Sequence, residues 1–144
     1  MAAFVLTVAA AVLTASIIGD RSTTDYGGGL DYTMRPISMS QELGVALVVA
    51  SIVGYVAAAI CLLRFAPDED SRQRSARAWR FLTLAGVVLG IAYRIVTAGV
   101  IGANIGGGLA VWVAVPLSTY LIVRAAKGLA ARPVTEHGQP TSAA

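Results

Sequence analysis

At 144 residues, with 56% hydrophobic side chains and a mean hydropathy of +0.71, the chain carries more apolar surface than one small water-soluble core can bury. We therefore expect a membrane protein, because the bilayer is the natural solvent for such a sequence. The net charge of +3 does not imply nucleic acid, because the cationic side chains flank apolar runs, as orientation signals do.

Four apolar runs approach the length of a spanning helix, which needs about 20 mostly apolar residues. They cover residues 2–19, 43–65, 81–101 and 105–123. The sequence thus predicts an all-α integral membrane protein with four transmembrane helices in two hairpins. The transmembrane domain covers residues 1–132, and a polar tail covers residues 133–144. A cleaved signal peptide is the alternative for the first run, but that run lacks a basic n-region.

Ten arginines and one lysine indicate the orientation. Five arginines lie between the second and third runs, at positions 64, 72, 74, 77 and 80, and three cations follow the fourth run, Arg124, Lys127 and Arg132. Because cytoplasmic loops are enriched in such residues, both segments and both termini are predicted to be cytoplasmic. The connection over residues 20–42 is then the outer loop.

The outer loop carries interleaved apolar side chains that favour packing against a neighbour over free mobility. These are Tyr26, Leu30, Tyr32, Met34 and Ile37. At its end, Ser38-Met39-Ser40-Gln41 matches a helix capping box with Ser38 as the N-cap, so we expect the second span to begin there.

Two stripes of small residues at four-residue spacing predict helix-packing faces, because spans in lipid associate through close backbone approach. One comprises Ala46, Ala50, Gly54 and Ala58 in the second span, and the other comprises Gly86 and Gly90 in the third. The alternative is chance, since alanine-rich spans produce this spacing readily.

Arg94 is the one charge well inside a span, and it continues the spacing of Gly86 and Gly90. It therefore points toward whichever helix packs on the glycines. Three interpretations stay open: it extends to headgroups or water, it pairs with an acid among Asp20, Asp25, Asp31 and Glu42, or it lines an ion or substrate path.

The arginines before the third span are candidates for contacts with lipid headgroups, although orientation alone explains them equally well. They are Arg72, Arg74, Arg77 and Arg80.

Residue types that carry catalysis or cofactors are scarce. The only histidine, His137, lies in the polar tail, the methionines lie outside the spans, and Cys61 is a lone cysteine that cannot form an internal disulfide. Haem in a helical bundle usually needs axial His or Met, and metals need clustered ligands. We therefore predict no cofactor, no metal site and no enzymatic activity.

The preference for arginine over lysine, with abundant Ala, Val and Gly, is typical of a GC-rich genome such as that of an actinobacterium. In size, span count, the outer loop over 26–38 and the Arg-rich inner loop, the chain resembles the small multi-pass accessory subunits of the mycobacterial cytochrome bcc and cytochrome c oxidase supercomplex. The resemblance implies a scaffold in the bacterial plasma membrane, without haem or copper of its own, that contacts oxidase subunits and lipids.

Two other functions compete with a non-catalytic accessory subunit. One is an independent, homo-oligomeric transporter or channel whose pore is lined by Arg94, Asn104, Ser51 and Thr97; a ring of arginines there would favour anions. The other is a membrane enzyme that acts on lipid, for which the loops offer no convincing nucleophile and base.

Overall fold

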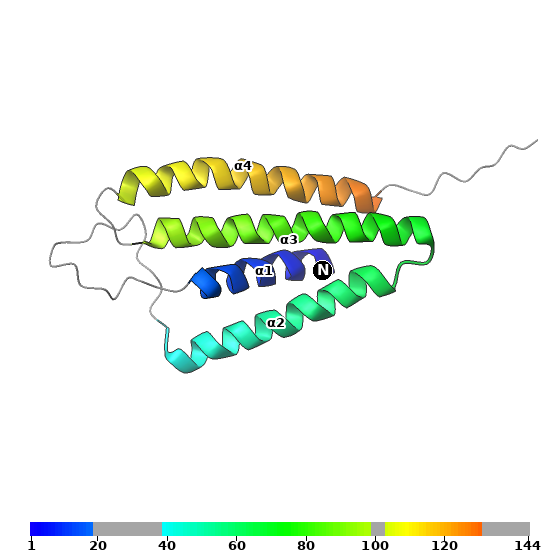
Figure 1. Ribbon diagram of the computed structural model, residues 1–144, viewed down its shortest axis with the longest axis horizontal. Coiled ribbons are helices and arrows are strands. Elements are labelled where there is room, and N and C mark those ends of the chain that lie inside the picture. The colour runs from blue at the N-terminus through cyan, green and yellow to red at the C-terminus, as the bar shows by residue number, and fades with distance from the viewer. Residues whose placement is uncertain (19–38, 99–102, 131–144) are drawn as a thin grey trace, which may run out of the picture.

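The computed structural model describes residues 1–18, 39–98 and 103–130, which form four α-helices (Figure 1). Their bounds are α1 Ala2–Ile18, α2 Gln41–Arg64, α3 Glu69–Thr97 and α4 Ala103–Ala130. The prediction of an all-helical protein is confirmed for this part of the chain. The predicted tail and most of the outer loop lie outside the described residues.

Three of the helices, α2, α3 and α4, are long and apolar enough to cross a membrane, which indicates a membrane protein. The remaining helix, α1, is apolar but has only 17 residues. Its length of about 26 Å falls slightly short of a hydrocarbon core of about 30 Å.

Helices α3 and α4 extend beyond the apolar runs from which we predicted spans. Helix α3 begins at Glu69 rather than near residue 81, because the arginine-rich segment continues the same helix. Helix α4 continues through Pro116 and past residue 123 to Ala130. The two extensions lie at the same end of the molecule, where α2 also ends (Figure 1). We call it the arginine-rich end.

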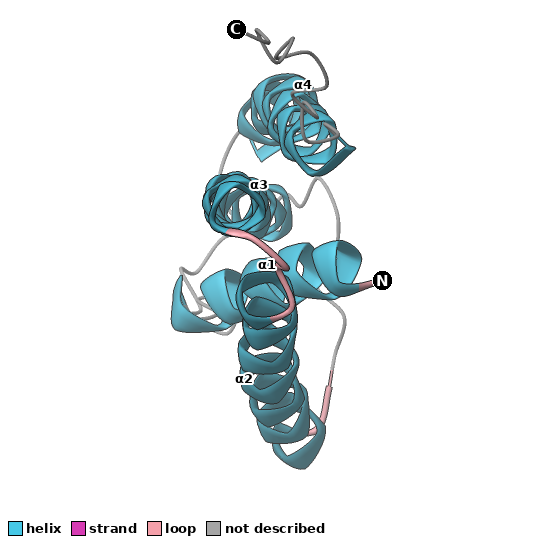
Figure 2. Cartoon of the chain, turned by 90° about the vertical axis from the view of Figure 1, so that its right-hand side faces the viewer, coloured by secondary structure: helices cyan, strands magenta, loops and turns pink. Residues whose placement is uncertain are grey.

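The helices stack in the order α4, α3, α1, α2 rather than around a common centre (Figure 2). Helix α3 packs extensively on α4 and α1, while α1 packs also on α2. Between α2 and α3 the contact is small, and α2 and α4 do not meet within the described residues. Helix α1 therefore lies between α3 and α2, whereas α2 and α4 are the two edges.

Helix α3 presents a heptad-spaced face of mostly small buried residues, which are Ser75, Ala78, Leu82, Ala85, Ala92 and Val96. Helix α4 buries a matching set, Ala114, Ser118, Leu121 and Ala125. Spacing of this kind keeps one face of a helix toward its partner over several turns. It explains how two long antiparallel helices stay together along their length.

The start of α2 differs from the predicted capping box. The N-cap is Ser40, whose Oγ accepts a hydrogen bond from the backbone N–H of Leu43 at 3.3 Å. The capping-box register with Ser38 as N-cap is therefore wrong by two residues. Both serines suit an N-cap chemically, so the sequence motif alone could not separate them.

Candidate functional site

Helices α1 and α3 approach each other closely at two glycines of α3. A Cβ atom added to Gly86 would lie 2.5 Å from the carbonyl oxygen of Thr7 and 2.6 Å from the Cβ atom of Ala10. At Gly90 it would lie 2.5 Å from the carbonyl oxygen of Ala11. No side chain fits at these separations, so both positions require glycine. We call this contact the α1–α3 seam.

The two helices of the seam run parallel, because Gly86 faces residues 7–11 of α1 and Gly90 faces residues 11–15. The hydroxyls on the α1 side are satisfied within their own helix. Thr7 donates to the carbonyl of Ala3 at 3.0 Å, and Thr14 donates to that of Ala10 at 2.8 Å. The seam therefore brings polar backbone together without leaving these side chains unpaired in an apolar environment.

Arg94 closes the seam at the end of α1. Its Nε donates a hydrogen bond to the carbonyl oxygen of Ala15, and the residue is half-buried. Ala15 belongs to the last turn of α1, where carbonyls lack intrahelical partners and the helix dipole is negative. A guanidinium from α3 thus caps the C-terminus of α1. This carbonyl is not the only group with which Arg94 interacts.

Of the acids proposed as partners for Arg94, Asp20, Asp25 and Asp31 lie outside the described residues, and Glu42 is exposed. The pairing therefore stays a prediction. The backbone acceptor was not among the three interpretations from sequence. The sequence nevertheless contained an indication of this contact. A cation that follows two glycines at four-residue spacing reaches the partner helix one turn farther along.

The predicted stripe on α2 divides into two parts. Ala58 is buried, and a Cβ atom on Gly54 would lie 3.4 Å from Cγ1 of Val5 in α1. Ala46 and Ala50, by contrast, are exposed. A stripe at four-residue spacing winds by about 40° per step around a helix of 3.6 residues per turn, so four positions cannot all face one straight partner.

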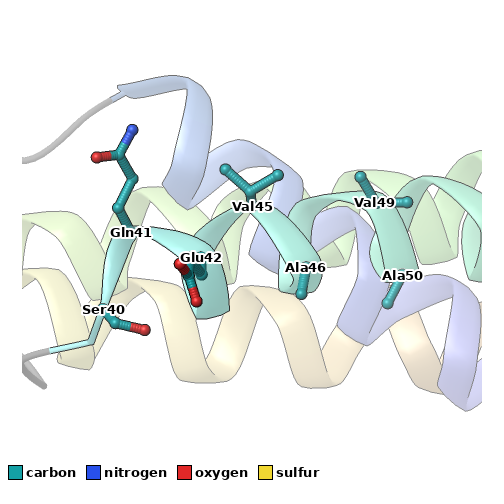
Figure 3. A pocket seen from close by; sticks show the side chains of 7 residues that line it. All are labelled: Ser40, Gln41, Glu42, Val45, Ala46, Val49 and Ala50. Atoms are coloured by element: carbon teal, nitrogen blue, oxygen red, sulfur yellow. The ribbon is translucent and has the colours of Figure 1, made fainter.

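The exposed half of that stripe lines an open groove near the start of α2 (Figure 3). Its described lining residues are Ser40, Gln41, Glu42, Val45, Ala46, Val49 and Ala50. The groove has an apolar floor with polar groups at one end. In Figure 3, Val45 and Val49 point to one side of the helix, while Ala46 and Ala50 point to the other.

Two further polar contacts join helices, and sequence reasoning missed them. The hydroxyls of Tyr55 in α2 and Thr83 in α3 share a hydrogen bond of 3.1 Å. Ser118 in α4 donates to the carbonyl of Ala85 in α3 at 3.4 Å. Hydroxyl side chains inside apolar runs could have indicated these contacts, since such groups hydrogen-bond across helices in membranes.

The four predicted headgroup residues lie on the extension of α3. Arg72, Arg77 and Arg80 are exposed, whereas Arg74 is half-buried and donates from Nη2 to the hydroxyl of Ser71 at 3.0 Å. The first turn of α3 is organised by the same serine. Its hydroxyl lowers the pKa of the exposed Asp68 carboxyl, with a smaller contribution from the charge of Arg74.

Within the described residues, no group of three or more His, Cys, Asp and Glu side chains could hold a metal ion. Cys61 is exposed on α2. The site therefore consists of helix contacts and a cationic end.

Comparison with known proteins provides no family for the chain: no family model, no curated protein and no solved structure matches it. What its length, composition and helices define is a class, that of small helical membrane proteins.

The seam predicts opposite effects for two glycine substitutions. Gly90→Ala forces α1 away from α3, and we expect it to destabilise the protein by about 1–3 kcal/mol, as overpacking does. In the matched control Gly44→Ala, the added Cβ atom meets nothing within 4 Å, and a small gain in helix propensity is expected. Thermal unfolding in mild detergent measures both. Equal shifts in Tm would contradict the seam.

Because Arg94 caps α1, we expect substitutions at this position to lower the stability of the protein by graded amounts. Arg94→Leu leaves the Ala15 carbonyl without this donor, and we expect a loss of about 1–3 kcal/mol. Arg94→Lys keeps a charge at the end of α1 and should fall between wild type and Leu. Arg77→Leu, at an exposed position, is the control. Equal stability of the Leu and wild-type proteins at position 94 would refute the capping role.

Proposed function

We propose that the chain is a non-catalytic accessory subunit of a larger integral membrane complex, with four spans and both termini in the cytoplasm. The observation that carries this proposal is the small-residue face of α2, which no other described helix covers. Only 6% of the 18-residue apolar stretch of α2 is buried, against 33% of the corresponding stretch of α3. Ala46 and Ala50 lie on the exposed part.

Small residues gain little from facing lipid, but they allow another backbone to approach. At Gly86 and Gly90, the same type of face is occupied by α1. By analogy, the face of Ala46 and Ala50 suits a helix from another subunit. Ser40, Gln41 and Glu42 at the end of the groove offer polar groups to that partner.

For the particular complex, we propose the actinobacterial cytochrome bcc and cytochrome c oxidase supercomplex in the bacterial plasma membrane. The support is the resemblance in size, span count and loop character described above. In that setting the chain is a scaffold without a cofactor of its own. Its edge helix α2 contacts a neighbouring subunit, and its other edge helix, α4, faces lipid.

The homo-oligomeric channel is the weaker alternative because two of its four pore candidates are engaged within the fold. Arg94 contacts the Ala15 carbonyl, and Thr97 is 3% exposed and donates to the carbonyl of Tyr93 at 2.8 Å. Such side chains are poorly placed to line a path for ions.

The orientation predicts the labelling of single cysteines in a Cys61→Ser background. Gln73→Cys, on the exposed extension of α3, should react with a membrane-impermeant maleimide only after the cells are permeabilised. Met39 precedes α2 and is 48% exposed, so Met39→Cys should react in intact cells. The reverse pattern would overturn the orientation.

If another subunit docks on the face of Ala46 and Ala50, bulky substitutions there should reduce the recovery of co-purifying partners. The wild-type protein, tagged and extracted in mild detergent, should retain other membrane subunits, and haem-bearing ones if the proposed complex is correct. Ala46→Leu with Ala50→Leu should lower their yield at least about tenfold, since close approach is blocked. The matched control, Ala126→Leu with Ala130→Leu, has the same spacing on exposed positions of α4.

Two outcomes would contradict the accessory-subunit proposal. One is equal partner recovery from the two double variants. The other is a haem-free homo-oligomer that conducts ions in liposomes, which would favour the channel.

A further inference from the structure

The arginine-rich end gathers charge from three helices that are separate in sequence (Figure 1). Its seven cationic side chains are Arg64, Arg72, Arg74, Arg77, Arg80, Arg124 and Lys127, and its acids are Asp68, Glu69 and Asp70. At the opposite end, the described helices contribute only Glu42 and Arg94 as charged side chains. The charge of the described bundle is therefore strongly one-sided.

Most of these cations are not used by the fold. Arg74 donates to Ser71, and Arg124 lies over the ring of Tyr120, 5.8 Å from its centroid. The remaining five make no hydrogen bond or ion pair with described residues, and all five are exposed: Arg64, Arg72, Arg77, Arg80 and Lys127. Their donors face outward and are available to an anionic ligand.

Two aromatic residues accompany these cations at the arginine-rich end. Trp79, next to Arg80, is half-buried against the buried cluster at this end, with its indole N–H turned inward, whereas Tyr120 is 57% exposed one turn from Arg124. Tryptophan and tyrosine concentrate at the membrane–water boundary. In addition, α3 is about 44 Å long against a core of about 30 Å, so its extension passes through the headgroup region.

We infer that the arginine-rich end binds the headgroups of anionic membrane phospholipids. Charge complementarity selects this occupant, because guanidinium groups pair bidentately with phosphate and the exposed cations surround the helix ends at phosphate depth. The inference goes beyond a topological role. Orientation requires only that the positive residues stay in the cytoplasm, whereas binding enriches anionic lipid around this end.

The two tryptophans allow a direct test on the full-length chain in vesicles of phosphatidylcholine and phosphatidylglycerol. Trp112→Phe leaves Trp79 as a reporter at the arginine-rich end, and Trp79→Phe leaves Trp112 as a control that is 81% exposed on α4. Bromine is placed on the acyl chains of one lipid or the other. Quenching then gives the relative association constant of the anionic lipid near each reporter.

We expect a preference for phosphatidylglycerol of at least about threefold at Trp79 and none at Trp112, since each cation near the surface attracts anionic lipid. Changing Arg72, Arg77 and Arg80 together to Gln should abolish the preference, whereas the triple Lys variant should keep it. Circular dichroism and quenching of Trp112 verify that the variants fold.

Equal quenching of Trp79 by the two brominated lipids would overturn the inference. So would a preference that survives the triple Gln substitution. In either case the arginines would serve orientation or an acidic protein partner instead. Because the test needs no partner protein, its result is independent of the accessory-subunit proposal.

Discussion

The close approach of α1 and α3 at Gly86 and Gly90 is the contact on which the rest of the bundle depends. Helices in lipid gain little by burying apolar side chains against each other, so they associate where backbones pack tightly and polar groups are satisfied. Helix α1 is short, and it supplies no charged residue to either of its ends. Its place is determined by the glycines of α3 along its length and by the guanidinium of Arg94 at its last turn.

Helix α3 organises the molecule because it presents different faces to its neighbours. The glycine face receives α1, and the face that carries Ala85 receives α4. Each of the other helices also makes a polar contact with α3, at Ala15, Tyr55 and Ser118. The stacked order that results leaves α2 and α4 at the edges. An arrangement of this kind exposes more apolar helix surface than a closed bundle, which is why we propose surfaces for other subunits and for lipid as the functional features of this chain.

The two proposed surfaces use different physics at different places. On α2, alanines near one end of the helix offer close packing to another helix, and the gain is van der Waals contact. At the arginine-rich end, exposed cations offer charge-assisted hydrogen bonds to phosphate. The two are compatible, since a subunit that docks through α2 keeps the cations of α3 and α4 at the membrane surface.

Local pattern alone was sufficient to predict the helices, their apolar character, the positions of the cations and the shared face of Gly86, Gly90 and Arg94. These features follow from residue type and a period of 3.6, which act within a few turns. The identity of the partner on that face, the division of the α2 stripe between Ala50 and Gly54, and the acceptor for Arg94 required the packed structure. Each depends on how helices distant in sequence cross, and a four-residue stripe winds about 40° per step, so its spacing cannot specify which part meets a neighbour.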